Sequence, residues 1–143
     1  MSQHYLEPVK TPETQPYWKA LANGQLQLPR CNDCQQFYFP PGNVCIHCTS
    51  DNICWQATSG KAFLYSYVIN HRPDPVWDSG EAMSVALVEL EEGPRVIATV
   101  VNCPQTPEAL VLDMPLQAVF DRRIGDTTML CFEPVNPAEG ALS

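Results

Sequence analysis

The second half of the chain alternates apolar and polar residues in short segments that are separated by turn residues. Alternation with period two places successive side chains on opposite faces of a strand, so this pattern predicts β structure. The expected strands span residues 61–70, 83–90, 95–102, 115–122 and 127–134. Residues 91–94 predict a hairpin turn, and Thr106-Pro107-Glu108 predicts one helical turn between the third and fourth strands.

Five strands with a small helical element between the third and fourth are typical of a Greek-key OB-fold barrel. An eight-stranded barrel needs more chain, and a β-sandwich is the alternative. We therefore predict a mainly β fold with a five-stranded OB-fold barrel over residues 59–135.

A short apolar stripe with helical spacing precedes the strands. Thr14 is positioned to cap a helix with Pro16 in its first turn, and Asn23-Gly24 is a helix stop. A helix of two turns is marginal alone, so it must dock on this protein's own core or on a partner subunit. The stripe consists of Tyr17, Trp18, Leu21 and Ala22.

Two close cysteine pairs, CNDC and CIHC, flank an aromatic spacer that ends in Pro-Pro-Gly. Each pair can present two thiolates from a tight turn, and two pairs close the tetrahedral all-sulfur site that Zn²⁺ accepts. A strand is predicted over residues 25–30, before the first pair, and a second strand that contains Trp55 is predicted after the second pair. The sequence predicts a rubredoxin-like zinc ribbon, with the helix, over residues 14–58. The predicted ligands are Cys31, Cys34, Cys45 and Cys48.

Other uses of these thiols are open to different degrees. Iron accepts the same ligand set. Disulfides need an oxidising compartment, and the opening residues MSQHYLEPVK contain no apolar segment of a secretory signal, which counts against disulfides. A redox-active pair usually opens a helix within a βαβ pattern, and the sequence shows no such pattern. His47 is a competing ligand, expected to be a neighbour only, and Cys54, Cys103 and Cys131 are expected to be packed thiols. Four protein ligands leave no open position, so the metal is expected to be structural.

The charge balance restricts the partners. Acidic residues outnumber Lys and Arg by 16 to 8 in 143 residues, which counts against nucleic-acid binding through the phosphate backbone. No apolar run approaches 18 residues, so we expect no membrane span and a cytoplasmic location. Residues 1–13 are expected to form a flexible arm, and 136–143 a disordered tail.

Ligands of OB barrels usually meet the mouth between the loop joining strands one and two and the loop joining four and five. Here both loops carry arginine, which suits a small anionic ligand such as a phosphate group. The alternative is that these arginines are solvated and pair with nearby carboxylates. The candidate ligand-binding residues are Arg72 and Trp77 in the first loop and Arg122 and Arg123 beside the second.

Catalytic motifs are scarce. His71 is the one histidine well placed for acid–base chemistry, but no G-x-S-x-G elbow, P-loop or G-x-G-x-x-G accompanies it. We therefore predict no catalytic residue.

The run PYWKALANGQLQLPRCNDCQQFYFPPGNVCIHC resembles the helix-plus-ribbon opening of a family of zinc-ribbon/OB-fold proteins associated with acyl-CoA metabolism, formerly a domain of unknown function. SYVINHRPDP, VALVELEEGPRVIATVV and DMPLQAVFD resemble its OB half. The similarity spans residues 14–134. Gln35 stands where the family often carries glycine, and Ile46 where proline is common; both affect the stiffness of the knuckles and not ligation.

The resemblance implies a non-catalytic accessory subunit. Family members work beside thiolase-like enzymes, including thiolases and the lipid-transfer-type aldolases that shorten acyl-CoA side chains, as in steroid degradation; some join MaoC-like hydratases. The chain would bind such a partner and help bind or channel acyl-CoA, and loop geometry places the CoA thioester at the mouth. A nucleic-acid-binding ribbon/OB module and a stand-alone acyl-CoA enzyme are the alternatives.

Overall fold

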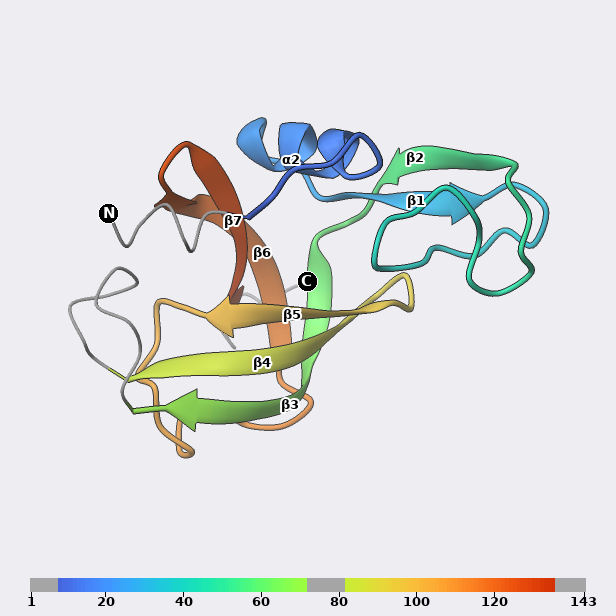
Figure 1. Cartoon of the computed structure of the whole chain (residues 1–143). Helices are drawn as coiled ribbons and strands as arrows, with labels where there is room; N and C mark the ends of the chain where they lie inside the picture. Colours follow the sequence, from blue (N-terminus) through green and yellow to red (C-terminus); the bar gives the residue numbers. More distant parts are fainter. Residues whose placement is uncertain (1–7, 72–81, 136–143) are drawn as a thin grey trace.

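The computed structural model describes residues 8–71 and 82–135, and places a small ribbon beside a closed β-barrel (Figure 1). The predicted tail at 136–143 and most of the predicted arm lie outside the described residues. The elements, in chain order, are α2 (Gln15–Ala22), β1 (Gln27–Cys31), β2 (Ile53–Ala57), β3 (Lys61–Asn70), β4 (Met83–Leu90), β5 (Arg95–Val100), β6 (Pro115–Ile124) and β7 (Thr127–Pro134).

The barrel closes in the strand order β3-β4-β5-β7-β6. β5 and β7 pair in parallel, and the other neighbours are antiparallel, with β3 joined to β6 at Ala62 and Leu116. This is the OB arrangement, so the predicted fold class is confirmed and the sandwich is excluded. β5 ends two residues earlier than predicted, before Asn102 turns the chain with a φ of 60°.

A β-bulge divides β3 into two halves with opposite phases. The register against β4 shifts between Leu64 and Ser66. Leu64 is buried before the shift, whereas Tyr67 and Ile69 contact the core after it. One extra residue reverses which face a strand presents. Even-numbered residues of β3 therefore face the core before the shift, and odd-numbered residues face it afterwards. Tyr65, at the shift, is exposed.

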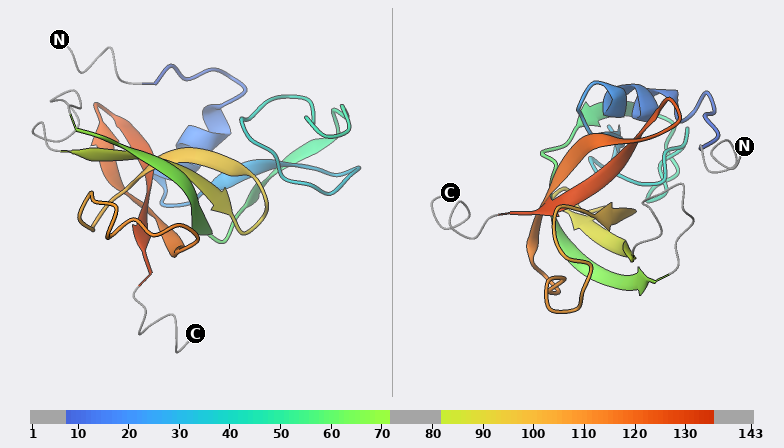
Figure 2. Two further views of the ribbon diagram at one scale, coloured as in Figure 1. Left: turned by 90° about the horizontal axis from the view of Figure 1, so that it is seen from below. Right: turned by 90° about the vertical axis from the view of Figure 1, so that its left-hand side faces the viewer.

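One apolar core joins the barrel to the helix and the base of the ribbon. Leu64, Val88 and Phe132 fill the barrel centre, and Leu21 of α2 and Leu28 of β1 belong to the same buried cluster. The right view of Figure 2 shows α2 lying across the barrel beside β7. The helix therefore docks on this protein's own core, which was the first of the two predicted alternatives. Whether residues 14–58 and 59–135 are separate folding units stays a prediction.

Two details of the predicted helix are wrong. Thr14 occupies the N-cap position, but its hydroxyl accepts a hydrogen bond from the Thr11 N–H (3.0 Å) and makes no cap bond to the helix. Ala20 is buried in place of Ala22, which is exposed, because the buried stripe turns toward β7 and β1. The predicted stop is confirmed: Asn23 is the C-cap, and the following glycine has a φ of +75°.

Replacing Phe132 by alanine tests the shared core. The ring is fully buried, so we expect its loss to lower the free energy of unfolding by about 3–5 kcal/mol. Denaturant titration followed by fluorescence measures the change. The matched control is Val111→Ala on a side chain that is 56% exposed, expected to cost less than about 0.5 kcal/mol. Equal effects of the two variants would contradict the assigned core.

Candidate functional site

The two cysteine knuckles have the same backbone form. In the first, the Gln35 N–H donates to the Cys31 carbonyl (2.8 Å), and in the second the Thr49 N–H donates to the Cys45 carbonyl (2.9 Å). Gln35 and Thr49 both adopt a left-handed conformation, with φ of 64° and 63°. This conformation favours glycine because a Cβ atom is sterically unfavourable in it. Glutamine in the first knuckle is therefore less favourable than glycine would be.

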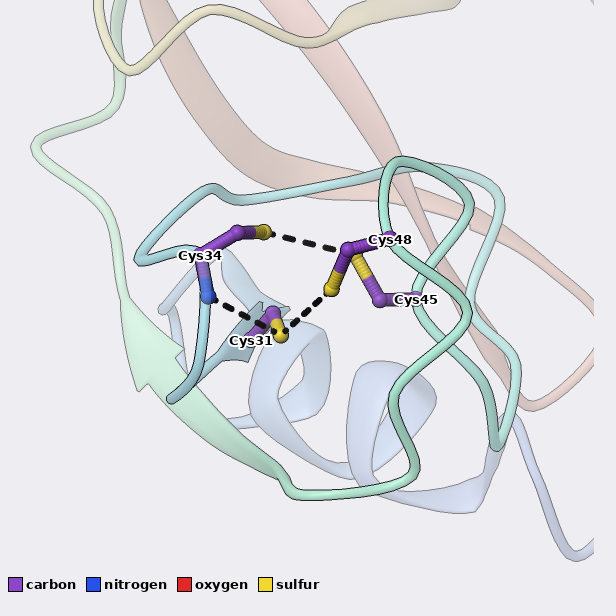
Figure 3. Close-up of side chains that lie close together, drawn as sticks. All are labelled: Cys31, Cys34, Cys45 and Cys48. Carbon is purple, nitrogen blue, oxygen red and sulfur yellow. Dashed lines mark hydrogen bonds between the residues drawn. The ribbon is translucent and has the colours of Figure 1, made fainter.

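The four predicted metal-ligating side chains meet at one point (Figure 3). Their sulfurs lie within 4.8 Å of one another, with Cys31 and Cys48 Sγ 3.5 Å apart and Cys34 and Cys45 Sγ 3.6 Å apart. All four are free thiols. A tetrahedron of Zn–S bonds spaces its sulfurs by about 3.8 Å, so the arrangement fits the ion.

Backbone donors and the crowding of sulfurs both affect ionisation. The N–H of Cys34, 3.5 Å from Cys31 Sγ, lowers the pKa of Cys31 to about 6. The backbone N–H of Ser50 lowers the pKa of Cys48, but the hydrogen bond with Cys31 and burial outweigh it and raise that pKa to about 12. Four crowded thiols do not all ionise without a cation, and a divalent ion makes four thiolates favourable.

His47 lies beside the four sulfurs and outside their group. Its Nε2 is 3.3 Å from the carbonyl oxygen of Phe37, while its backbone N–H donates to Cys45 Sγ (3.3 Å). The imidazole therefore has a structural partner in the spacer.

A polar network that sequence reasoning missed ties the knuckles together. The Asp33 carboxylate accepts hydrogen bonds from the Ser50 hydroxyl and from Asn52 Nδ2, and Asn32 Nδ2 donates to Asn52 Oδ1 (3.1 Å). Cys54 Sγ donates to Asn32 Oδ1 (3.4 Å), so this thiol belongs to the network and not to the ligand set. The Asn and Asp residues inside the knuckles were the signal for it.

The barrel mouth contains a cavity of about 450 Å³, and one predicted ligand-binding residue lines it. Arg122 is half-buried and contributes to its wall, whereas Arg123 is exposed and lies outside the described lining. Neighbours on a strand point to opposite faces, which separates the two arginines. Arg72 and Trp77 lie outside the described residues.

The polar wall of this cavity depends on Gln105, another residue that the sequence did not reveal. Its Nε2 donates to the Val100 carbonyl (2.8 Å), and its Oε1 accepts from the Ser84 N–H (2.7 Å), so the amide bridges β4 and β5. Cys103 also lines the cavity, and burial raises its pKa, which disfavours a nucleophilic thiolate. The described lining contains no carboxylate and no imidazole. Its chemistry suits binding of an anion.

Ribbon and barrel together define a zinc-ribbon/OB-fold protein. Residues 18–53 match the domain model described as "ChsH2, rubredoxin-like zinc ribbon domain", and residues 55–121 match "ChsH2, C-terminal OB-fold domain". The chain therefore belongs to the ChsH2 family that these two domain models describe.

Three similar proteins place the chain more closely. It is 30% identical to the "Probable enoyl-CoA hydratase alpha subunit" of Thermomonospora curvata over 86% of this chain and 38% of that protein. It is 32% identical to the "DUF35 domain-containing scaffold protein" of Methanocaldococcus jannaschii over 65% of each chain. It thus spans less than two thirds of either relative. The solved "Ltp2-ChsH2(DUF35) aldolase" contains a chain with a TM-score of 0.77 and 28% identity, over 90% of this chain and 98% of that chain.

Among the described residues, no helix has the length and apolar character needed to cross a bilayer.

Replacing Cys31 by serine tests the metal centre. A structural metal of this kind contributes on the order of 10 kcal/mol of folding free energy, so we expect loss of the bound ion and disorder of the ribbon. Metal analysis after gel filtration and amide NMR spectra measure the two effects. Cys54→Ser is the matched control in the same lobe and is expected to retain one ion per chain. Full metal content and an ordered ribbon in Cys31→Ser would contradict the assignment.

Proposed function

We propose that the chain is a non-catalytic accessory subunit that binds a thiolase-fold enzyme, a thiolase or an acyl-CoA aldolase, and helps to bind or channel its acyl-CoA substrate. The observation that carries the proposal is the likeness to a subunit of the Ltp2-ChsH2(DUF35) aldolase along nearly the whole of that subunit. The word scaffold in the name of the Methanocaldococcus relative supports the same role.

The metal in this proposal is zinc, held by Cys31, Cys34, Cys45 and Cys48 with a structural role. The four sulfurs satisfy the usual coordination number of zinc, so no position is left for a substrate. Zinc stabilises the two knuckles and the spacer between them.

The mouth is the proposed acyl-CoA site. Phosphate groups of CoA require cationic donors, and the guanidinium group of Arg122 offers a planar, bidentate donor at the cavity wall. The chain carries a net charge of −8, so binding of an anion depends on a local cationic group such as this arginine. Arg72 and Trp77, on the sequence-predicted loop, are proposed to complete the site, and the catalytic groups are proposed to belong to the partner.

A MaoC-like hydratase is the second candidate partner. The Thermomonospora relative and the "3-oxo-4,17-pregnadiene-20-carboxyl-CoA hydratase alpha subunit" of Mycobacterium tuberculosis, 26% identical over 80% of this chain and 36% of that protein, both carry hydratase names. The second name favours a steroid side chain as the acyl group and hence a role in lipid metabolism.

Purification of the tagged chain from its host tests the accessory role. We expect a thiolase-fold protein to co-purify in stoichiometric amount, and its activity toward acyl-CoA to rise when the chain is added back. The ribbon-disrupted Cys31→Ser variant is the control. Turnover of acyl-CoA by the isolated wild-type chain, abolished by His71→Ala, would establish an enzyme instead. Absence of any acyl-CoA enzyme from the purified sample would also refute the proposal.

Removal of one arginine tests the mouth. Arg122→Ala in the assembled complex is expected to weaken CoA binding by about 10-fold or more, because a charge-assisted hydrogen bond is worth about 1.5–3 kcal/mol. Isothermal titration calorimetry measures the affinity. The exposed neighbour provides the matched control, since Arg123→Ala makes the same change of charge outside the cavity. Equal affinities of the two variants would refute the site.

A further inference from the structure

The outer face of strands β3, β4 and β5 is apolar although it faces solvent. The inward residues of β4, among them Ala86 and Val88, are buried, so Val85 and Leu87 point outward. The strand register places Val68 opposite Val85 and Ile97 opposite Leu87, which groups these side chains. We call this surface the apolar face; it consists of Phe63, Tyr65, Val68, Val85, Leu87 and Ile97.

The exposure of this face is large. Ile97 is 72% exposed, Val68 63% and Phe63 46%. The side of a sheet that faces only water normally carries polar residues. Contiguous apolar patches on the surface of a monomer commonly mark interaction sites. The three strands form the front sheet of the barrel in Figure 1.

The apolar face continues into a groove between α2, the ribbon and β7. Ile97 borders both, and the groove holds about 280 Å³. The other lining residues are Thr14, Tyr17, Trp18, Phe39, Pro41, Met129 and Leu130. The helix, ribbon and barrel thus contribute to one continuous surface.

Trp18 contributes an aromatic side chain to this groove. Its indole ring packs against the core cluster and lies 4.9 Å from the ring of Tyr17, centroid to centroid. The indole Nε1 is buried below the surface and has no hydrogen-bond partner among the described residues. Tryptophan is a common energetic centre of protein interfaces, so the groove offers an aromatic contact to a bound partner.

The charges of the surface favour a different protein over a second copy. On the apolar face, Glu89 is paired with Arg95 (3.1 Å), and the Arg95 guanidinium lies 3.8 Å above the Tyr65 ring. The face is therefore close to neutral, while the rest of the chain carries the net charge of −8. Two copies of this chain would repel each other through the negative charge that surrounds the apolar face. A less acidic partner would not be repelled in this way.

We propose that the apolar face and the Trp18 groove together form the docking surface for the thiolase-fold subunit. This inference rests on the proposed function. An apolar centre with an arginine and an aromatic ring at its border has the composition of a protein interface. The strands of the barrel are all paired, so the partner docks through side chains and not by adding a strand.

Binding of the purified thiolase-fold subunit that co-purifies with the chain tests the surface. Ile97→Asp is expected to weaken the complex by at least 10-fold in calorimetry, because it buries a charge at the interface. Val111→Asp introduces the same charge at an exposed position off the face and is expected to leave affinity unchanged. Trp18→Ala removes the aromatic side chain from the groove and is expected to weaken binding by about 10-fold or more. Thermal unfolding verifies that each variant is folded.

The outcomes separate the two proposals. If the wild type binds the thiolase-fold subunit and Ile97→Asp binds equally well, the docking surface is wrong while the proposed function stands. If the wild type does not bind such a subunit, the proposed function fails and the docking surface fails with it. If sedimentation shows a wild-type dimer that Ile97→Asp dissociates, the face joins two copies of the chain, which also overturns the proposal.

Discussion

The convergence of four sulfur atoms from two knuckles is the constraint on which the ribbon depends. Between β1 and β2 the chain forms only an isolated bridge, Arg30 to Phe37, and otherwise turns and irregular segments. The buried cluster of this lobe consists of Cys31, Tyr38 and Cys45. A core of that size does not offset the entropy of ordering the segment, and the proposed metal ion, held by the four cysteines, would supply the missing stability.

The metal centre influences more than its own lobe because the ribbon packs on the barrel. Phe39 and Trp55 contact the core cluster that extends from α2 to β7, and Phe39 also lines the groove at Trp18. Order at the knuckles therefore fixes one wall of the proposed docking surface. The mouth with Arg122 lies on the barrel and depends on the closure of its strands. The proposed docking surface and the proposed anion site are therefore separate surfaces of one small chain.

Much of the fold follows from local patterns in the sequence, and the exceptions have tertiary causes. β4 and β7 have the predicted bounds because turn residues delimit their alternation. The spacing of the cysteine pairs predicted the sulfur cluster that the knuckles form. The bulge near Tyr65, however, depends on how β3 curves into the barrel. Gln105 acquires its role only when β4 and β5 lie side by side, and the outward face of β4 was not predictable because MSVALVEL is apolar on both faces.

Amide hydrogen exchange with and without a chelator tests whether a bound metal keeps the ribbon folded. We expect one zinc ion per chain in the purified protein. We also expect chelation to abolish protection of the amides of Tyr38 and Thr49, which donate to the carbonyls of Pro29 and Cys45, while Val88 in the barrel stays protected. If the ribbon amides of the metal-free protein remain as protected as those of the barrel, the ribbon does not depend on the metal.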